Sequence, residues 1–314
     1  MSNIWDQTID VNEELVRALI TQVGLDVRTI ELLGEGYDNV AYLVNNEWVF
    51  RFPRRELGIM CMENEIAILP YIAEQVSFQL TNPKFIGTPS DAYPYPFAGY
   101  HIVPGKTLCE AAQPLIDDLK FARTLGLWLK ELHSVPIKQE HLQLIKGDNS
   151  WRLDIENRVK FITSQVVKYE QYFTAAGFPQ AQLLDIINLF HKLDFKLDNP
   201  CYLHGDLYFR HIVVDENILP CGLIDWGDTH IGQPGIDLSA GIMIFNETAL
   251  EEFFASYGEV GDDTRLIASF RSLCHNLGSL GYFHQKNLSA KVWVDAALHN
   301  SIAKFIKYIN IKKT

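Results

Sequence analysis

The chain has 314 residues, 47% of them hydrophobic and 21% charged, a balance that is typical of a globular protein and long enough for two lobes with separate cores. Its 27 basic and 39 acidic residues give a formal charge of −12, which argues against nucleic acids or anionic membranes as partners and suits a cationic small molecule, although negative charge also favours solubility alone. With no apolar stretch of membrane-spanning length, no signal-peptide pattern and no Cys-x-x-Cys pair, we expect a cytoplasmic monomer whose cysteines are buried thiols.

The first hundred residues predict a sheet accompanied by two helices. Apolar residues at helical spacing predict helices over residues 12–23 and 59–75. The pair Asn45-Asn46 predicts a tight hairpin turn, because asparagine tolerates positive φ. Five strands are predicted over residues 29–33, 40–44, 47–52, 84–86 and 97–103.

The pair Pro104-Gly105 interrupts the last of these strands and predicts a boundary between an N-terminal lobe, residues 1–103, and a C-terminal lobe, residues 104–314. Apolar residues on both sides of a turn at Asn217 and Pro220 predict a β-hairpin of strands 212–214 and 221–224. The rest of the C-terminal lobe is mostly helical, with long amphipathic segments over residues 116–133, 151–176, 180–197, 236–254, 264–283 and 292–311.

The most informative stretch runs from residue 202 to residue 228. It contains His204-Gly205-Asp206, then His211 five residues after Asp206, and Asp225 nineteen residues after Asp206. Because the predicted hairpin brings its two ends together, we expect His211 and Asp225 to lie close to each other. Protein kinases use the same layout: a catalytic aspartate, a metal-binding partner five positions on, and a metal-binding aspartate after the next strand.

This layout predicts a role for each of the three side chains. Asp206 would orient an acceptor hydroxyl and accept its proton, and Asp225 would hold the Mg²⁺ that bridges phosphate oxygens. His211 is an unusual partner for Mg²⁺, which prefers oxygen ligands, so a histidine that only orients the loop is the alternative. We predict that a neutral His211 faces the metal.

The motif resembles the aminoglycoside phosphotransferase family, and the resemblance runs over most of the chain. Segments 34–39, 48–53 and 64–66 are similar to the N-terminal lobe of the aminoglycoside 2''-phosphotransferase branch, and segment 97–105 is similar to its hinge. Macrolide phosphotransferases are also similar, and both groups often carry histidine at the position of His211. The resemblance implies an α+β, bilobal protein-kinase-like fold with a five-stranded N-lobe sheet and a mainly helical C-lobe.

Four residues of the N-terminal lobe are candidates for the nucleotide phosphates. Gly34 and Gly36 would let backbone amides approach a phosphate, although a glycine pair between strands often only serves a turn. Arg51 occupies the position of the phosphate-pairing lysine of kinases, and it keeps the charge with a different geometry. Glu65, on the following helix, would be its ion-pair partner, the alternative being a solvated glutamate.

The resemblance also implies where the nucleotide base lies. Backbone groups of His101 and Val103 would bond to the base, and Tyr100 would form the back of its pocket. A phenol there would crowd the 6-amino end of an adenine, so we expect GTP to be preferred, with ATP second.

The acceptor is expected near Asp206 and the C-terminal helices. Asp237 resembles a family position that braces the catalytic region, and the apolar run 239–245 would suit a more hydrophobic acceptor such as a macrolide. Aromatic residues would pack either on such a ligand or in the core: Tyr282, Phe283 and Trp293. Five carboxylates would either attract a polyamine sugar or simply be exposed: Glu247, Glu251, Glu252, Asp262 and Asp263.

The leading hypothesis is a Mg²⁺-dependent kinase that transfers the γ-phosphate of GTP or ATP to a hydroxyl of a cationic antibiotic, in the first place an aminoglycoside. Alternatives within the same class are a macrolide kinase and a kinase of a small amino alcohol or sugar. A non-catalytic nucleotide-binding pseudokinase is the alternative from another class. Arg51 and His211 favour the pseudokinase, whereas the intact pair Asp206 and Asp225 favours an enzyme.

Overall fold

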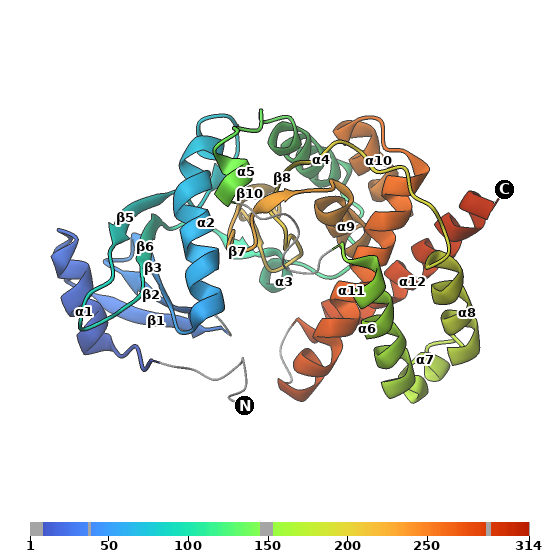
Figure 1. Cartoon of the computed structure of the whole chain (residues 1–314), viewed down its shortest axis with the longest axis horizontal. Coiled ribbons are helices and arrows are strands. Elements are labelled where there is room, and N and C mark those ends of the chain that lie inside the picture. Colours follow the sequence, from blue (N-terminus) through green and yellow to red (C-terminus); the bar gives the residue numbers. More distant parts are fainter. Residues whose placement is uncertain (1–8, 37–38, 145–152, 287–289, 314) are drawn as a thin grey trace.

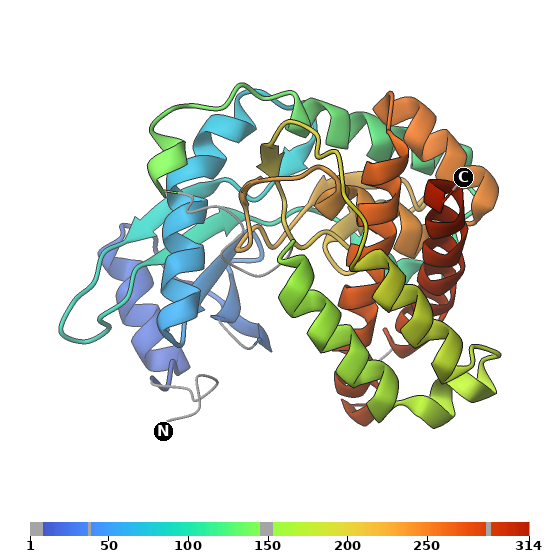
Figure 2. The ribbon, with the colours of Figure 1, turned by 45° about the vertical axis from the view of Figure 1, so that its right-hand side comes forward.

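The computed structural model describes residues 9–36, 39–144, 153–286 and 290–313. A sheet with two helices and a mainly helical part lie side by side, as Figures 1 and 2 show. This is the α+β, two-lobed architecture that the sequence predicts. Among the helices that these residues form, none combines the length and the apolar character needed to cross a membrane.

The N-terminal lobe contains a five-stranded antiparallel sheet in the order β1-β2-β3-β6-β5. All five predicted strands are present: β1 (Ile30–Glu35), β2 (Asn39–Val44), β3 (Trp48–Pro53), β5 (Pro83–Gly87) and β6 (Phe97–His101). The two predicted helices are α1 (Glu13–Gln22) and α2 (Glu56–Ala73). Helix α1 buries Val16, Leu19 and Ile20 against one face of the sheet, in a core that includes Phe50 and Phe52.

The turn between β2 and β3 is the predicted tight turn, and both of its asparagines have left-handed backbones. Their φ angles are 56° for Asn45 and 57° for Asn46. The side chain of Asn45 also accepts the amides of Arg28 and Thr29 and donates to the carbonyl of Asp26. The turn therefore fixes both the hairpin and the approach to β1.

A short strand that the sequence does not predict joins the two lobes. Strand β4 (Gln79–Leu80) pairs in parallel with β10 (Pro220–Leu223) of the C-terminal lobe. Just before β4, Phe78 stacks on Trp128 and Trp226, with ring centroids 5.1 and 6.4 Å apart. The chain after α2 is thereby fixed to the C-terminal lobe.

Strand β7 (Lys106–Thr107) follows Pro104-Gly105 and pairs with β9 (Ile212–Val214). The first strand after Pro104-Gly105 thus pairs within the C-terminal lobe, and the lobe boundary between residues 103 and 104 stays a prediction. The other strands of the C-terminal lobe are β8 (Cys201–Leu203) and β11 (His230–Gly232), which pair with each other.

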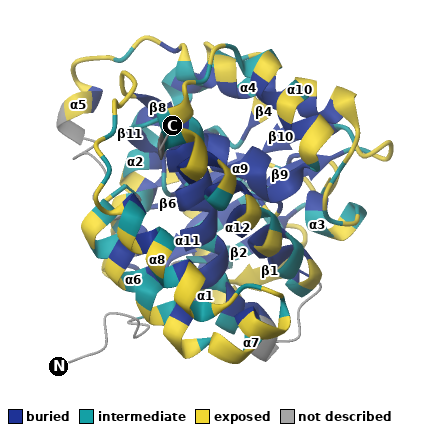
Figure 3. Cartoon of the chain, turned by 90° about the vertical axis from the view of Figure 1, so that its right-hand side faces the viewer, coloured by how far each residue is buried: buried dark blue, intermediate teal, exposed yellow. Residues whose placement is uncertain are grey.

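The C-terminal lobe is mainly helical, as predicted. Its helices are α3 (Leu108–Ala111), α4 (Leu119–His133), α5 (His141–Leu144), α6 (Ile155–Lys168), α7 (Glu170–Ala175), α8 (Gln180–Phe190), α9 (Gly235–Ile244), α10 (Glu247–Tyr257), α11 (Asp262–Lys286) and α12 (Lys291–Lys313). Helix α9 is buried along its whole length, which Figure 3 shows in dark blue.

Three predicted helices were too long. The segment predicted over 151–176 is two helices that meet at Tyr169. Residues 151–152 at its start lie outside the described part of the chain, as do residues 37–38 of the segment 34–39. The segment over 236–254 breaks where Asn246 caps α10 by accepting the amide of Ala249. Helix α8 ends at Phe190 rather than residue 197.

Candidate active site

The loop between β8 and β9 carries Asp206, and helix α9 braces it. The buried carboxylate of Asp237 accepts the backbone amides of His204 at 2.7 Å and Gly205 at 2.9 Å. Burial works against the charged form, but the hydrogen bonds from His133 and from the amide of Gly205 lower the pKa of Asp237. The bracing role that the sequence indicated for Asp237 is confirmed.

Gly205 cannot be replaced without moving the backbone. Its φ is +84°, and a Cβ there would lie 2.0 Å from the carbonyl oxygen of Asp228. Both conditions select glycine just before Asp206.

His204 connects the loop of Asp206 to the segment that carries Asp225. Its Nε2 lies 2.9 Å from the carbonyl oxygen of Ile224, which can only accept, so Nε2 donates. Its Nδ1 then accepts the amide of Asp206 at 3.3 Å. Burial lowers the pKa of His204, so the neutral ring fits both contacts.

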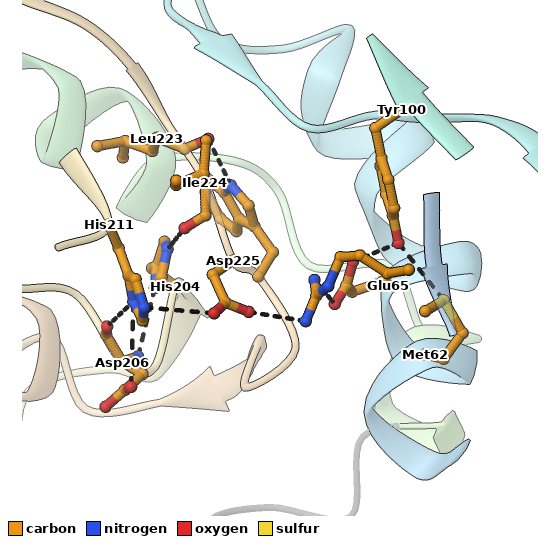
Figure 4. Close-up of polar contacts among 11 residues, drawn as sticks. Met62, Glu65, Tyr100, His204, Asp206, His211, Leu223, Ile224 and Asp225 are labelled. Atoms are coloured by element: carbon orange, nitrogen blue, oxygen red, sulfur yellow. Dashed lines mark hydrogen bonds and ion pairs between the residues drawn. The ribbon is translucent and has the colours of Figure 1, made fainter. Parts of the chain in front are cut away.

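The hairpin of β9 and β10 brings the other two predicted residues together. Ile224 donates its amide to the carbonyl of His211 at 3.0 Å, just beyond the paired strands. As a result, Nε2 of His211 lies 3.3 Å from Oδ2 of Asp225, as Figure 4 shows. The predicted proximity of these two side chains is confirmed.

His211 also contacts the loop of Asp206. Its Nδ1 lies 2.7 Å from the carbonyl oxygen of Asp206 and therefore donates to it, and the same nitrogen is 4.0 Å from Oδ2 of Asp206. Burial lowers the pKa of His211, but Asp225 and then Asp206 outweigh this and raise it above the ordinary value.

Asp225 lies between the two lobes. It has a left-handed backbone, with φ of 64°, which is uncommon outside glycine. Its Oδ1 lies 2.8 Å from Nη2 of Arg51 in β3. Its side chain is half-exposed, and although its partial desolvation raises the pKa of Asp225, Arg51 and then His211 lower that pKa well below its usual range.

On the N-terminal side, three side chains continue this network. Nη1 of Arg51 lies 2.7 Å from Oε1 of Glu65, so the predicted ion pair is present. The hydroxyl of Tyr100 donates to Oε2 of Glu65 at 2.7 Å, and Figure 4 shows the phenol turned toward α2. A continuous line of polar contacts thus runs from Tyr100 to Asp206.

The remaining nucleotide candidates lie at the edges of the same sheet. Gly34 is in β1 with open space where a Cβ would be, whereas the amide of Gly36 donates to the carbonyl of Asn39 within the turn. His101 ends β6 with its ring 3.8 Å from the ring of Trp48, and Val103 is buried.

Two residues near Asp206 were not predicted as site residues from the sequence. Arg271 and His275, one turn apart on α11, place Nη2 and Nδ1 at 3.2 and 3.5 Å from Oδ1 of Asp206. They lie on the predicted helix over 264–283, but a basic residue on an amphipathic helix gives no signal of its own.

The expected acceptor residues have other partners. Glu251 pairs with Arg265 and Glu252 with Arg123, at 3.3 and 2.7 Å. Glu247 forms ion pairs with two lysines of α12, and Asp263 pairs with a third lysine there: Lys304, Lys307 and Lys312. The aromatic rings of Phe283 and Trp293 and the apolar run of α9 are buried in the core, so core packing rather than ligand contact accounts for them.

This fold and this arrangement of charged side chains define a kinase-like phosphotransferase. The model of the phosphotransferase enzyme family (APH) matches residues 29–270, so the chain belongs to this family and is an enzyme of its transferase class. Over 233 residues, 68% of either protein, it is 24% identical to the uncharacterized protein YcbJ of Bacillus subtilis (strain 168).

Solved structures share the fold. The GDP and kanamycin complex of APH(2")-IIIa has a TM-score of 0.67 and 23% identity, covering 94% of this chain and 98% of that one. The macrolide 2'-phosphotransferase MphH from Brachybacterium faecium has a TM-score of 0.63 and 18% identity, covering 91% and 98%. The predicted resemblance to aminoglycoside and macrolide phosphotransferases is therefore confirmed.

Proposed function

We propose that this phosphotransferase moves the γ-phosphate of GTP or ATP to a hydroxyl of an antibiotic, with Asp206 as the catalytic base. The observation that carries the proposal is the line of contacts from Arg51 through Asp225 and His211 to Asp206. It supports a site in which Arg51 would contact phosphates, Asp225 would bind a divalent cation and Asp206 would accept the proton of the acceptor hydroxyl, as equivalent groups do in kinases.

Asp206 would act on the acceptor. Its carboxylate is partly exposed, and the brace from Asp237 through Gly205 holds its loop in place. A positioned carboxylate can orient the hydroxyl and take up its proton as the oxygen–phosphorus bond forms. The nucleoside diphosphate is the leaving group.

Mg²⁺ is the cofactor that the fold family implies, and the side chains fit it. The two carboxylates raise the pKa of His211, so Nε2 would have to lose its proton for Mg²⁺ to bind; because Nδ1 donates to the Asp206 carbonyl, the resulting neutral ring would carry its lone pair on Nε2, beside the carboxylate of Asp225. The described residues contain no cluster of three or more metal-ligating side chains, so phosphate oxygens and water would supply the other ligands. Bound there, Mg²⁺ neutralises phosphate charge.

The nucleotide would lie against β1, β3 and the segment after β6. Neither φ nor packing requires glycine at position 34, which fits close approach of a phosphate to its backbone. Ile102 donates its amide to Glu47, so the alternating backbone groups of His101 and Val103 point to the other side, where a base could bond. Tyr100, fixed by Glu65, supports the preference for GTP over ATP.

For the acceptor, we propose an aminoglycoside first, because the chain shares its fold with a kanamycin complex over most of its length. A macrolide is the second candidate. The observation that favours it is the internal pairing of Glu247, Glu251, Glu252 and Asp263, which leaves less negative charge for a polycation.

The decisive test is Asp206→Asn in a panel of aminoglycosides, macrolides and small amino alcohols with GTP and ATP. We expect the wild type to phosphorylate one of these classes and the variant to lose at least about 100-fold in kcat, since general-base catalysis contributes on that order. Nucleotide affinity, measured by calorimetry, should stay within about twofold, because Asp206 contacts no proposed nucleotide ligand except through His211.

A wild type that binds GTP but transfers phosphate to no acceptor or water would support the pseudokinase instead. Full activity in Asp206→Asn would refute its role as base.

A further inference from the structure

Helix α11 presents two side chains to the proposed base. Arg271 and His275 both approach Oδ1 of Asp206, at 3.2 and 3.5 Å. Arg271 is only 4% exposed, and His275 packs under the ring of Tyr208 with centroids 4.5 Å apart. Long side chains enclosed in this way keep one geometry, unlike those of a surface ion pair.

These two residues lie beyond the part of the chain that the family model describes. The matched segment ends at residue 270, directly before Arg271. The contact to Asp206 therefore comes from a portion of this chain that the general family pattern does not specify.

The contact has two physical consequences for phosphoryl transfer. The hydrogen bond from Arg271, with His275 3.5 Å from the same oxygen, restrains the Asp206 carboxylate and so favours one of its oxygens for the acceptor hydroxyl. An ionised carboxylate also repels the negative charge of the phosphoryl group as it is transferred, and a neighbouring guanidinium offsets that repulsion in the transition state, more strongly in a partly buried setting than in water.

We propose that Arg271 and His275 are positioning residues for the transfer: they hold the Asp206 carboxylate from α11, and Arg271 offsets its charge in the transition state. The inference rests on the proposed role of Asp206 as base. It makes helix α11 of the C-terminal lobe, in addition to the loop that carries Asp206, part of the machinery that determines turnover.

The test compares Arg271→Met, Arg271→Lys and a matched control, Arg265→Met. Arg265 is on the same helix, where it pairs with Glu251 and lies over the ring of Phe254 at 4.0 Å. We expect Arg271→Met to lower kcat by about 10- to 100-fold, the range found when a group that orients an active-site ligand is removed, with KM for GTP changed by less than about threefold. Arg271→Lys should recover part of the loss, and Arg265→Met should stay within about twofold.

A double-mutant cycle separates this role from a structural one. If Arg271 acts through Asp206, Arg271→Met should remove little further activity from Asp206→Asn, measured by single-turnover release of GDP. Thermal unfolding of each variant checks that rates refer to folded protein. The Asp206→Asn/Arg271→Met variant removes the carboxylate charge that Arg271→Met leaves without its guanidinium partner, and it should fold even if Arg271→Met does not.

The inference is overturned if Arg271→Met behaves like Arg265→Met, if its effect is entirely on KM, or if it loses the same factor in both backgrounds. For His275, we expect the kcat of His275→Asn, which keeps a hydrogen-bond donor, to be closer to that of the wild type than the kcat of His275→Leu. The reference acceptor is kanamycin, or erythromycin if kanamycin is not modified. A wild type that transfers phosphate to none of the acceptors would refute the proposed function itself. In that case every variant, Arg265→Met included, would show the same lack of transfer.

Discussion

Two residues at the site have backbone angles that most side chains avoid. Gly205 precedes Asp206 at φ of +84°, and Asp225 has φ of 64° although it is not a glycine. Left-handed backbone costs about 1–2 kcal/mol for a residue with a Cβ. Asp225 keeps this conformation because Arg51 and His211 hold both of its oxygens.

Replacing Gly205 by alanine should destabilise the protein strongly. The added Cβ would meet the Asp228 carbonyl at 2.0 Å, in addition to the unfavourable φ. The matched control is Gly177→Ala, since Gly177 has φ of +83° with nothing within 4 Å. We expect Gly177→Ala to lower the free energy of unfolding by about 1 kcal/mol and Gly205→Ala by about 2 kcal/mol more, measured by urea denaturation. Equal losses would mean that the loop moves freely away from Asp228.

Among single residues, the sequence predicts those site residues that lie close together along the chain or that match a known motif. Asp206, His211 and Asp225 fall within one hairpin, and the kinase pattern adds Arg51 and its partner Glu65. Arg271 and His275 follow about 65 residues after Asp206 without any motif, and only the packing of α11 brings them to its carboxylate. Nothing in a single sequence indicates that contact.

Among the elements, those with a strong local signal were predicted well. The hairpin of β2 and β3 depends on Asn45-Asn46, and the long helices follow from their apolar faces. Strand β4 has only two residues and is defined by its pairing with β10. Two residues are too few to show the alternation of apolar and polar side chains by which a strand is predicted. The breaks at Tyr169 and Phe245 fall inside continuous apolar patterns, where tertiary packing overrides the helical preference.

The β2–β3 turn gives a test of that local signal. Both asparagines are left-handed, but Asn45 alone bonds to Arg28, Thr29 and Asp26 through its side chain. We expect Asn46→Gly to raise the free energy of unfolding by a few tenths of a kcal/mol, about 0.5 at most, and Asn45→Gly to lower it by about 1–3 kcal/mol. Chemical denaturation of both variants checks this, and similar effects at the two positions would contradict the assigned side-chain bonds.

For the whole molecule, nucleotide binding should appear as added stability. GTP with Mg²⁺ at 100 times its Kd should raise the free energy of unfolding by about 2.7 kcal/mol. Arg51→Met should reduce the rise in Tm, because it removes the proposed phosphate contact, whereas Arg17→Met, which breaks a surface pair with Glu13 and a hydrogen bond to the carbonyl of Val27, should not. If both variants keep the full rise in Tm, Arg51 does not bind the nucleotide.

Helix α2 belongs to both lobes. Its last turns are attached to the C-terminal lobe by Tyr71, which donates to the carbonyl of Pro136, and by Ser77 just beyond it, which donates to Glu131. Its middle carries Glu65, almost fully enclosed with Arg51. Any separation of the sheet from the helical lobe would therefore pivot at the end of α2, carrying Arg51 and Glu65 as one unit away from the half-exposed Asp225. Incoming phosphates would then compete with Asp225 for the guanidinium of Arg51. On nucleotide binding, Arg51 would exchange the carboxylate of Asp225 for a phosphate of the nucleotide.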